Sequence, residues 1–128
     1  VRSSAASDVY KRQVDVRSMA EYQGERFWPS GASEPNGRAG HAPFAIHQPI
    51  EGLFDDRGAF RPPADLRDLF SSIDLDDGKE IITYCTIGGR AATAWFVLTH
   101  LCGRDRVRVY DGSWAEWGRR IDTPVERS

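Results

Sequence analysis

A cysteine followed by a glycine-rich turn is the part of the sequence best suited to chemistry. Cys85 directly follows the apolar stretch 80–84, which predicts a β-strand, and precedes the apolar stretch 91–101, which predicts a helix. Gly88 and Gly89 allow the backbone to curl around the sulfur. A helix N-terminus offers unpaired N–H groups and the positive end of its dipole, so we expect it to lower the pKa of Cys85. The pattern therefore predicts a nucleophilic, anion-binding cysteine.

The spacing between Cys85 and the next arginine separates two kinds of cysteine chemistry. Cysteine-dependent phosphatases place about five residues between cysteine and arginine, so that the loop wraps a tetrahedral phosphate. Four residues separate Cys85 from Arg90, which makes a tighter cradle, better suited to one additional sulfur atom on Cys85. We therefore predict a substrate-binding loop that consists of Thr86, Ile87, Gly88, Gly89 and Arg90.

The other cysteine and the histidines are interpreted differently. A buried cysteine usually behaves as a small hydrophobic residue, and Cys102, near the end of the expected helix, is assigned this packing role. Two cysteines without a small-scaffold pattern indicate reduced thiols and a cytoplasmic location. Neither cysteine has metal-ligand spacing to His41, His47 or His100, so no metal site is expected.

Composition restricts the classes of partner. The chain has 128 residues, which is the size of one domain, and 40% of them are hydrophobic, which is enough for a sizeable core. Its 17 basic and 19 acidic residues are interspersed and give a net charge of −2, so no basic stripe for a nucleic acid or a membrane surface is present. No apolar run reaches the roughly 20 residues of a membrane span. We expect a soluble domain with small ligands.

The N-terminal residues differ in character from the rest. Residues 1–13 are rich in serine and alanine, lack periodicity and resemble a translated adapter remnant, so we expect a non-native or disordered leader. The domain itself is expected over 14–126. It opens with a strand over 14–16, and the Ser-x-x-Glu spacing of Ser18 and Glu21 predicts a capping box that starts a short helix.

The remaining segments alternate between helix and strand. Four glycines and two prolines in 23–40 predict a long loop. Further elements are expected as a strand over 45–47, a helix over 66–73, a turn at Asp77-Gly78, a strand over 80–84, a helix over 91–101 and a strand over 107–110. This alternation predicts an α/β fold, a three-layer domain with a central parallel sheet flanked by helices on both faces. The helix over 91–101 is apolar nearly all round, so we expect it to be buried on more than one side.

Four groups of residues together resemble one known family, the rhodanese-type sulfurtransferases. The likeness is to the catalytic C-terminal domain of tandem-domain thiosulfate or 3-mercaptopyruvate sulfurtransferases and covers about 14–125. It rests on Val14-Asp15-Val16-Arg17 with Glu21-Tyr22, on Gly40-His41 with Pro43 and Ala45, on the Cys85–Arg90 loop, and on Asp111-Gly112-Ser113-Trp114-Ala115-Glu116-Trp117. The resemblance implies that the family's first strand and helix, and an upstream rhodanese-like domain, are missing from this chain.

The resemblance also implies a reaction. Cys85 would take sulfane sulfur from a small anionic donor, thiosulfate or 3-mercaptopyruvate, become a persulfide, and pass the sulfur to cyanide or a thiol. No metal or organic cofactor is implied. Arg17 matches a position at which the family holds the donor's anionic group. The Thr86-Ile87-Gly88 sequence has neither the basic residues typical of thiosulfate enzymes nor the Gly-Ser-Gly of mercaptopyruvate enzymes, so the donor stays open.

Several residues keep two interpretations. Arg17 either binds the donor or forms a surface salt bridge with Glu21, and Arg90 either binds the anion or pairs with an acid. Trp114 either lines the mouth of the pocket or packs in the core, and Asp111 is assigned a helix cap. Two functions stand beside sulfur transfer: a non-catalytic sulfur-carrier or regulatory rhodanese module, and a phosphatase or arsenate-reductase-like enzyme.

Overall fold

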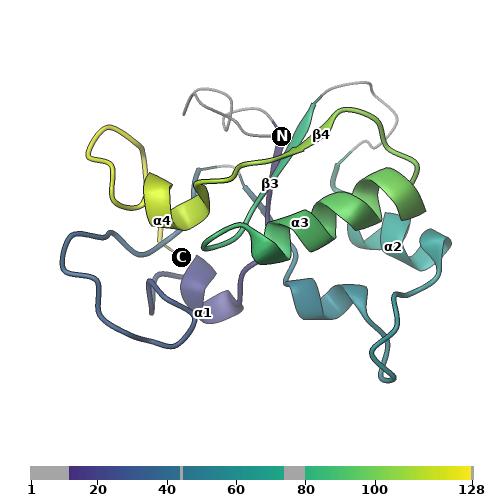
Figure 1. The fold of residues 1–128 in the computed structure, drawn as a ribbon, viewed down its shortest axis with the longest axis horizontal. Helices are drawn as coiled ribbons and strands as arrows, with labels where there is room; N and C mark the ends of the chain where they lie inside the picture. Colours follow the sequence, from purple (N-terminus) through teal and green to yellow (C-terminus); the bar gives the residue numbers. More distant parts are fainter. Residues whose placement is uncertain (1–11, 44, 74–79, 128) are drawn as a thin grey trace.

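The protein is described by a computed structural model that covers residues 12–43, 45–73 and 80–127. Its centre is a four-stranded parallel sheet in the order β2-β1-β3-β4 (Figure 1). The strands are β1 (Arg12–Asp15), β2 (Ile46–His47), β3 (Ile81–Tyr84) and β4 (Val107–Val109). The segments that connect the strands are α1 (Met19–Tyr22), η2 (Ile50–Leu53), α2 (Pro63–Leu69), α3 (Gly89–Phe96) and η3 (Val97–Leu101), and α4 (Ser113–Trp117) follows the last strand. The predicted parallel α/β fold is confirmed.

Alternation along the strands buries both faces of the sheet. In β3, Ile81 packs on one face, whereas Ile82 and Tyr84 pack on the other. The first face is covered by apolar residues of η2, α2, α3 and η3, which include Leu53, Leu66, Ala91, Ala94, Val97 and Leu98. The second face is covered by α4 and by the long loop before β2, through Phe27, Ala42, Tyr110, Trp114 and Trp117. Cys85 continues the alternation of β3 and belongs to the first face.

The helix after the cysteine agrees with the prediction in its packing but not in its regularity, and one strip of it is exposed. Ala91 and Ala94 of α3 are buried, but Phe96 is 41% exposed, and Ala92 and His100 are also exposed. These three positions are four residues apart and therefore share one face. The helix nevertheless packs on more than one side, as expected, because α3 contacts β3, β4 and η2, and η3 contacts α2. The segment ends as a π-helical turn, η3, and not as regular α-helix.

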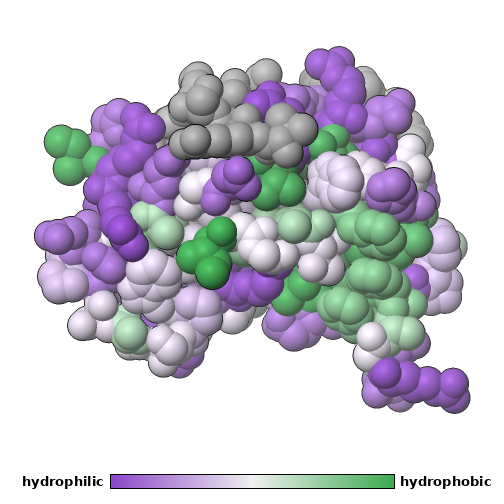
Figure 2. All heavy atoms as spheres, viewed as in Figure 1, coloured by the Kyte–Doolittle hydropathy of each residue, from purple (hydrophilic) through white to green (hydrophobic). Residues whose placement is uncertain are grey.

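Hydrophobic side chains gather on the surface over α3 and η2, as Figure 2 shows. Phe54 stacks on Phe60 with ring centroids 4.9 Å apart, and Phe60 stacks on Phe96 at 5.8 Å. This explains how an apolar residue is accommodated on the outer face of α3: part of its ring is covered by a neighbouring aromatic side chain.

Other elements agree with the sequence apart from their ends. Ser18 and Glu21 form the predicted capping box of α1, and no helix or strand interrupts 23–40. The strand β1 begins at Arg12, two residues before the predicted start of the domain. Residues 1–11 of the expected leader and the expected turn at Asp77-Gly78 lie outside the described residues. In the described part of the chain, no helix is long and apolar enough to cross a membrane.

Candidate active site

Cys85 lies at the carboxyl end of β3, which with β1 forms the inner pair of strands in the sheet. Its side chain is 1% exposed. The N–H of Gly88 donates a hydrogen bond to Cys85 Sγ at 3.0 Å. Gly88 has φ +113°, a left-handed value that side-chain-bearing residues rarely adopt, and it serves as the N-cap of α3. The predicted curl of the loop around the sulfur therefore depends on this glycine.

One side of the loop is held by the start of α4. Ser113 Oγ accepts the N–H of Cys85 at 3.1 Å and donates to the carbonyl of Tyr110 at 2.8 Å. The N–H groups of Trp114 and Ala115 donate to the carbonyls of Cys85 and Thr86, each at 2.9 Å. All these groups are uncharged. Asp111, which was expected to cap this helix, is exposed, and the N-cap is Gly112 without a side-chain hydrogen bond, so that expectation is wrong.

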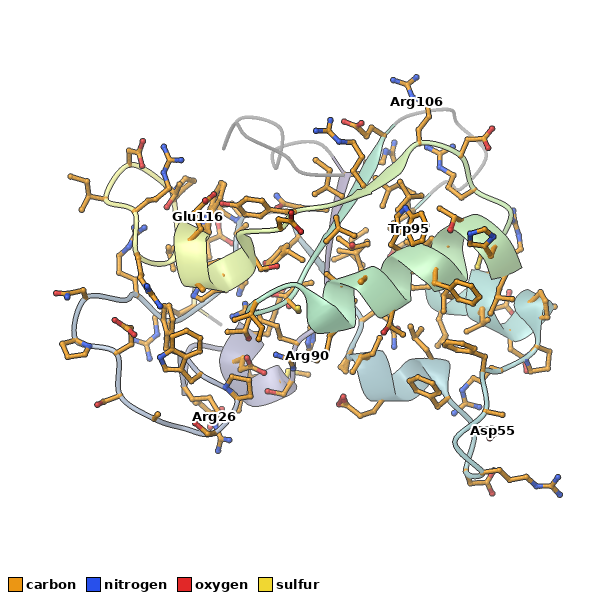
Figure 3. All side chains as sticks on the ribbon, viewed as in Figure 1. Arg26, Asp55, Arg90, Trp95, Arg106 and Glu116 are labelled. Atoms are coloured by element: carbon orange, nitrogen blue, oxygen red, sulfur yellow. The ribbon has the colours of Figure 1, made fainter. Side chains whose placement is uncertain are left out.

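The other side of the loop is held by the carboxylate of Glu21, which is fully buried. Arg90 binds it through both terminal nitrogens, Nη1 to Oε1 at 3.0 Å and Nη2 to Oε2 at 3.1 Å. The hydroxyl of Thr86 donates to Oε2 and accepts from Arg90 Nη2 at 2.8 Å. Figure 3 shows Arg90 between α1 and the start of α3. Of the two interpretations of Arg90, the structure has the pairing with an acid.

The ion pair shifts the pKa values of both partners. Burial alone would raise the pKa of Glu21, but hydrogen bonds from Arg90 and Thr86 outweigh it and hold this pKa below its ordinary value of 4.5. Burial alone would lower the pKa of Arg90, but the hydrogen bond and the charge of Glu21 raise it. Both groups are therefore charged at neutral pH.

A cavity of about 250 Å³ opens beside the sulfur. Its walls are formed by Trp28, Pro29, Cys85, Thr86, Ile87, Gly89 and Arg90. Four of the five predicted loop residues thus line it, and Gly88 contributes its N–H to the sulfur. Ile87 is 72% exposed at the tip of the loop. Trp28 and Pro29 come from the long loop over 23–40, which was predicted as a loop but whose residues were not assigned to the site.

Arg17 does not line this cavity. Its side chain is fully buried and forms an ion pair with Asp15, with Nη2 and Oδ2 2.6 Å apart, and Nη2 also donates to the carbonyl of Gly40. The alternative of a surface salt bridge with Glu21 is wrong, since Glu21 is occupied by Arg90. Arg17 is thus paired with Asp15, while its Nη1 has no hydrogen-bond partner among the described residues, and its contact with a donor stays a prediction.

Trp114 likewise does not line the cavity. It is fully buried, its Nε1 donates to the carbonyl of Arg38 at 2.9 Å, and the guanidinium of Arg17 lies 4.6 Å from the centroid of its ring. The structure therefore places Trp114 in the core, which was the packing alternative. The tryptophan at the pocket wall is Trp28.

Cys102 does not line the cavity. Cys102 is buried on the first face of the sheet, and burial raises the pKa of its thiol. Within 12–43, 45–73 and 80–127, no cluster of three or more His, Cys, Asp or Glu side chains could hold a metal ion.

The sheet topology and the loop at its carboxyl edge define a class: a parallel α/β domain with a cysteine-centred ligand loop. The chain belongs to the rhodanese-like domain family, whose model matches residues 4–120. It is 45% identical over 113 residues to SseA of Mycobacterium tuberculosis, which is named as a candidate thiosulfate sulfurtransferase. A protein of Haloferax volcanii with the same kind of name is 41% identical over 114 residues.

The alignment with the M. tuberculosis relative covers 88% of this chain and 37% of the relative. For the H. volcanii relative the two shares are 89% and 40%, so the chain spans well under half the length of either relative. Among solved structures, an anaerobic ergothioneine biosynthesis enzyme from Chlorobium limicola, in complex with trimethyl histidine, aligns with a TM-score of 0.76 at 31% identity. The alignment covers 91% of this chain and 28% of that one. A further structure, of EanB, contains a cysteine persulfide in a tetrahedral intermediate state with ergothioneine and gives the same TM-score.

Proposed function

We propose that this domain is a sulfurtransferase that carries sulfane sulfur as a persulfide on Cys85. The observation that carries the proposal is the placement of Cys85 Sγ: it lies at the wall of the cavity and accepts the N–H of Gly88. A backbone donor aimed at the sulfur can hold the charge of the persulfide that the reaction forms there. The relatives named for thiosulfate sulfurtransferase and the neighbour with a cysteine persulfide support the same chemistry.

The proposed reaction has two balanced steps. The Cys85 thiolate attacks the outer sulfur of thiosulfate, the sulfur–sulfur bond of the donor breaks, and sulfite leaves with the bonding electron pair. With 3-mercaptopyruvate, the Cys85 thiolate attacks the sulfur and the carbon–sulfur bond breaks. The electron pair leaves with the pyruvate enolate, which takes up the proton of the donor's thiol to give pyruvate. A thiolate or cyanide then attacks the outer sulfur of the persulfide, and Cys85 leaves as a thiolate, ready for another cycle. We expect ping-pong kinetics.

Intact-protein mass spectrometry tests this function. Reduced wild type, Cys85→Ser and Cys102→Ser are incubated separately with thiosulfate and with 3-mercaptopyruvate. The expected result is a gain of one reducible sulfur atom in wild type and Cys102→Ser, but none in Cys85→Ser. Cys102 is the matched control because it is also a buried thiol but lies outside the cavity. Absence of loading in a folded wild type would refute the proposal.

Turnover distinguishes an enzyme from a sulfur carrier. A catalytic domain releases many equivalents of transferred sulfur when donor and acceptor are both in excess. A carrier loads once and then stops. We expect turnover, and the donor with the higher kcat/KM identifies the substrate.

A further inference from the structure

The cavity beside Cys85 has one apolar side. Trp28 and Pro29 of the long loop and Ile87 at the tip of the cysteine loop supply indole, ring and aliphatic surface. Its volume of about 250 Å³ lies just below the roughly 300–1,000 Å³ that is typical of pockets for drug-sized ligands. The space therefore suits a compact organic molecule that makes apolar contacts next to the sulfur.

The charge of the cavity is largely compensated. Of the described residues that line it, Arg90 is the one that carries a permanent charge, and its guanidinium is already paired with Glu21 through two contacts. An ion that is already paired attracts a further anion weakly. On the apolar side formed by Trp28, Pro29 and Ile87, a ligand therefore binds through apolar contact more than through charge.

Trp28 is fixed in orientation by its surroundings. Its Nε1 donates to Glu34 at 3.1 Å, and the ring of Phe27 meets it edge to face with centroids 5.1 Å apart. The guanidinium of Arg119 lies 5.4 Å from the centroid of the indole and 3.8 Å from Glu34, measured between nitrogen and oxygen. A wall held in this way is preformed, so a ligand that contacts it does not have to order it.

We propose that Trp28 determines the specificity for the sulfur acceptor and favours thiols with an apolar, planar body over small polar thiols and cyanide. This inference rests on the proposed function. The acceptor thiolate attacks the outer sulfur of the Cys85 persulfide, a new sulfur–sulfur bond forms, and the bond to Cys85 breaks. The apolar body of the acceptor packs against Trp28, and Ile87 covers it from the cysteine loop.

The test compares two thiols of similar acidity, benzyl mercaptan and 2-mercaptoethanol, as acceptors from persulfide-loaded protein. The measurement is the ratio of their kcat/KM values in wild type, Trp28→Ala and Trp28→Phe. We expect a preference for benzyl mercaptan of about tenfold in wild type, since aromatic packing of this kind supplies that factor. Trp28→Ala should reduce the ratio to about one, and Trp28→Phe, which keeps an aromatic face, should retain most of it.

The outcomes of this test distinguish a failure of the role of Trp28 from a failure of the proposed sulfur transfer through Cys85. Loading of Cys85 is recorded by mass spectrometry before the acceptor is added, and a wild type that does not load overturns both. Normal loading with an equal ratio in wild type and Trp28→Ala overturns the role of Trp28 alone. Because the readout is a ratio within each variant, a general loss of activity in Trp28→Ala does not imitate the expected result.

Discussion

The two sides of the cysteine loop are held by different kinds of interaction. On the α4 side, the hydroxyl of Ser113 and two backbone N–H groups bind the loop, and none of these groups titrates. On the α1 side, Glu21 binds Thr86 and Arg90 through charge-assisted hydrogen bonds. The same short loop is thus positioned by a neutral contact and by a buried ion pair.

The difference matters because the two kinds of contact respond differently to change. A neutral hydrogen bond contributes about 1 kcal/mol to stability and does not depend on pH. A buried ion pair adds little net stability, but the loss of one partner is costly since the other charge is left without compensation. We infer that the α4 side sets the shape of the loop, whereas the α1 side makes that shape sensitive to charge.

The largest effect is expected from breaking the charged side. Glu21→Ala leaves Arg90 partly buried and without its partner, which should lower the free energy of unfolding by about 3 kcal/mol. Urea denaturation measures the change. Glu25→Ala is the matched control, because Glu25 is an exposed carboxylate three residues after α1 ends at Tyr22, and it should change stability by less than about 0.5 kcal/mol. Equal effects of the two substitutions would contradict the role of Glu21.

A smaller effect is expected from the neutral side. Ser113→Ala removes the acceptor of the Cys85 N–H and should cost about 1–2 kcal/mol by thermal or urea unfolding. Ser113 also has φ +47°, a left-handed value that costs a side-chain-bearing residue about 1 kcal/mol. Ser113→Gly loses the same hydroxyl but relieves this strain, so it should be less destabilising than Ser113→Ala. The reverse order would show that the backbone at Ser113 is not strained.

The sequence predicted what depends on neighbours along the chain. The fold, the strand before Cys85, the capping box of Ser18 and Glu21 and the loop residues that line the cavity follow from periodicity, turn residues and short motifs. Each of these patterns lies within a few residues of the feature that it predicts.

Hydrogen-bond and ion-pair partners that are far apart in the sequence were not predictable in the same way. Glu21 is 69 residues from Arg90, and Ser113 is 28 residues from Cys85. Arginines compete for nearby acids, and the sequence does not show that Arg17 takes Asp15 while Arg90 takes Glu21. The same holds for the tryptophans: the place of Trp28 at the wall is set by the path of a long loop without regular structure.

The smallest expected effect concerns pH. The loss of unfolding free energy caused by a substitution should depend on pH on the α1 side of the loop but not on the α4 side, which makes this the sharpest comparison of the two sides. The pKa of Glu21 is lower in the folded protein than its ordinary value of 4.5, so its contribution is fully present above that pH and is lost as the pH falls through the folded value. The destabilisation by Glu21→Gln, measured by urea unfolding, should therefore shrink between neutral pH and pH values below 4.5. The penalty of Ser113→Ala should stay constant over the same range, because no titrating group takes part in its hydrogen bonds. Parallel curves for the two variants would mean that the charge of Glu21 does not hold the loop, and that its hydrogen bonds alone distinguish the α1 side.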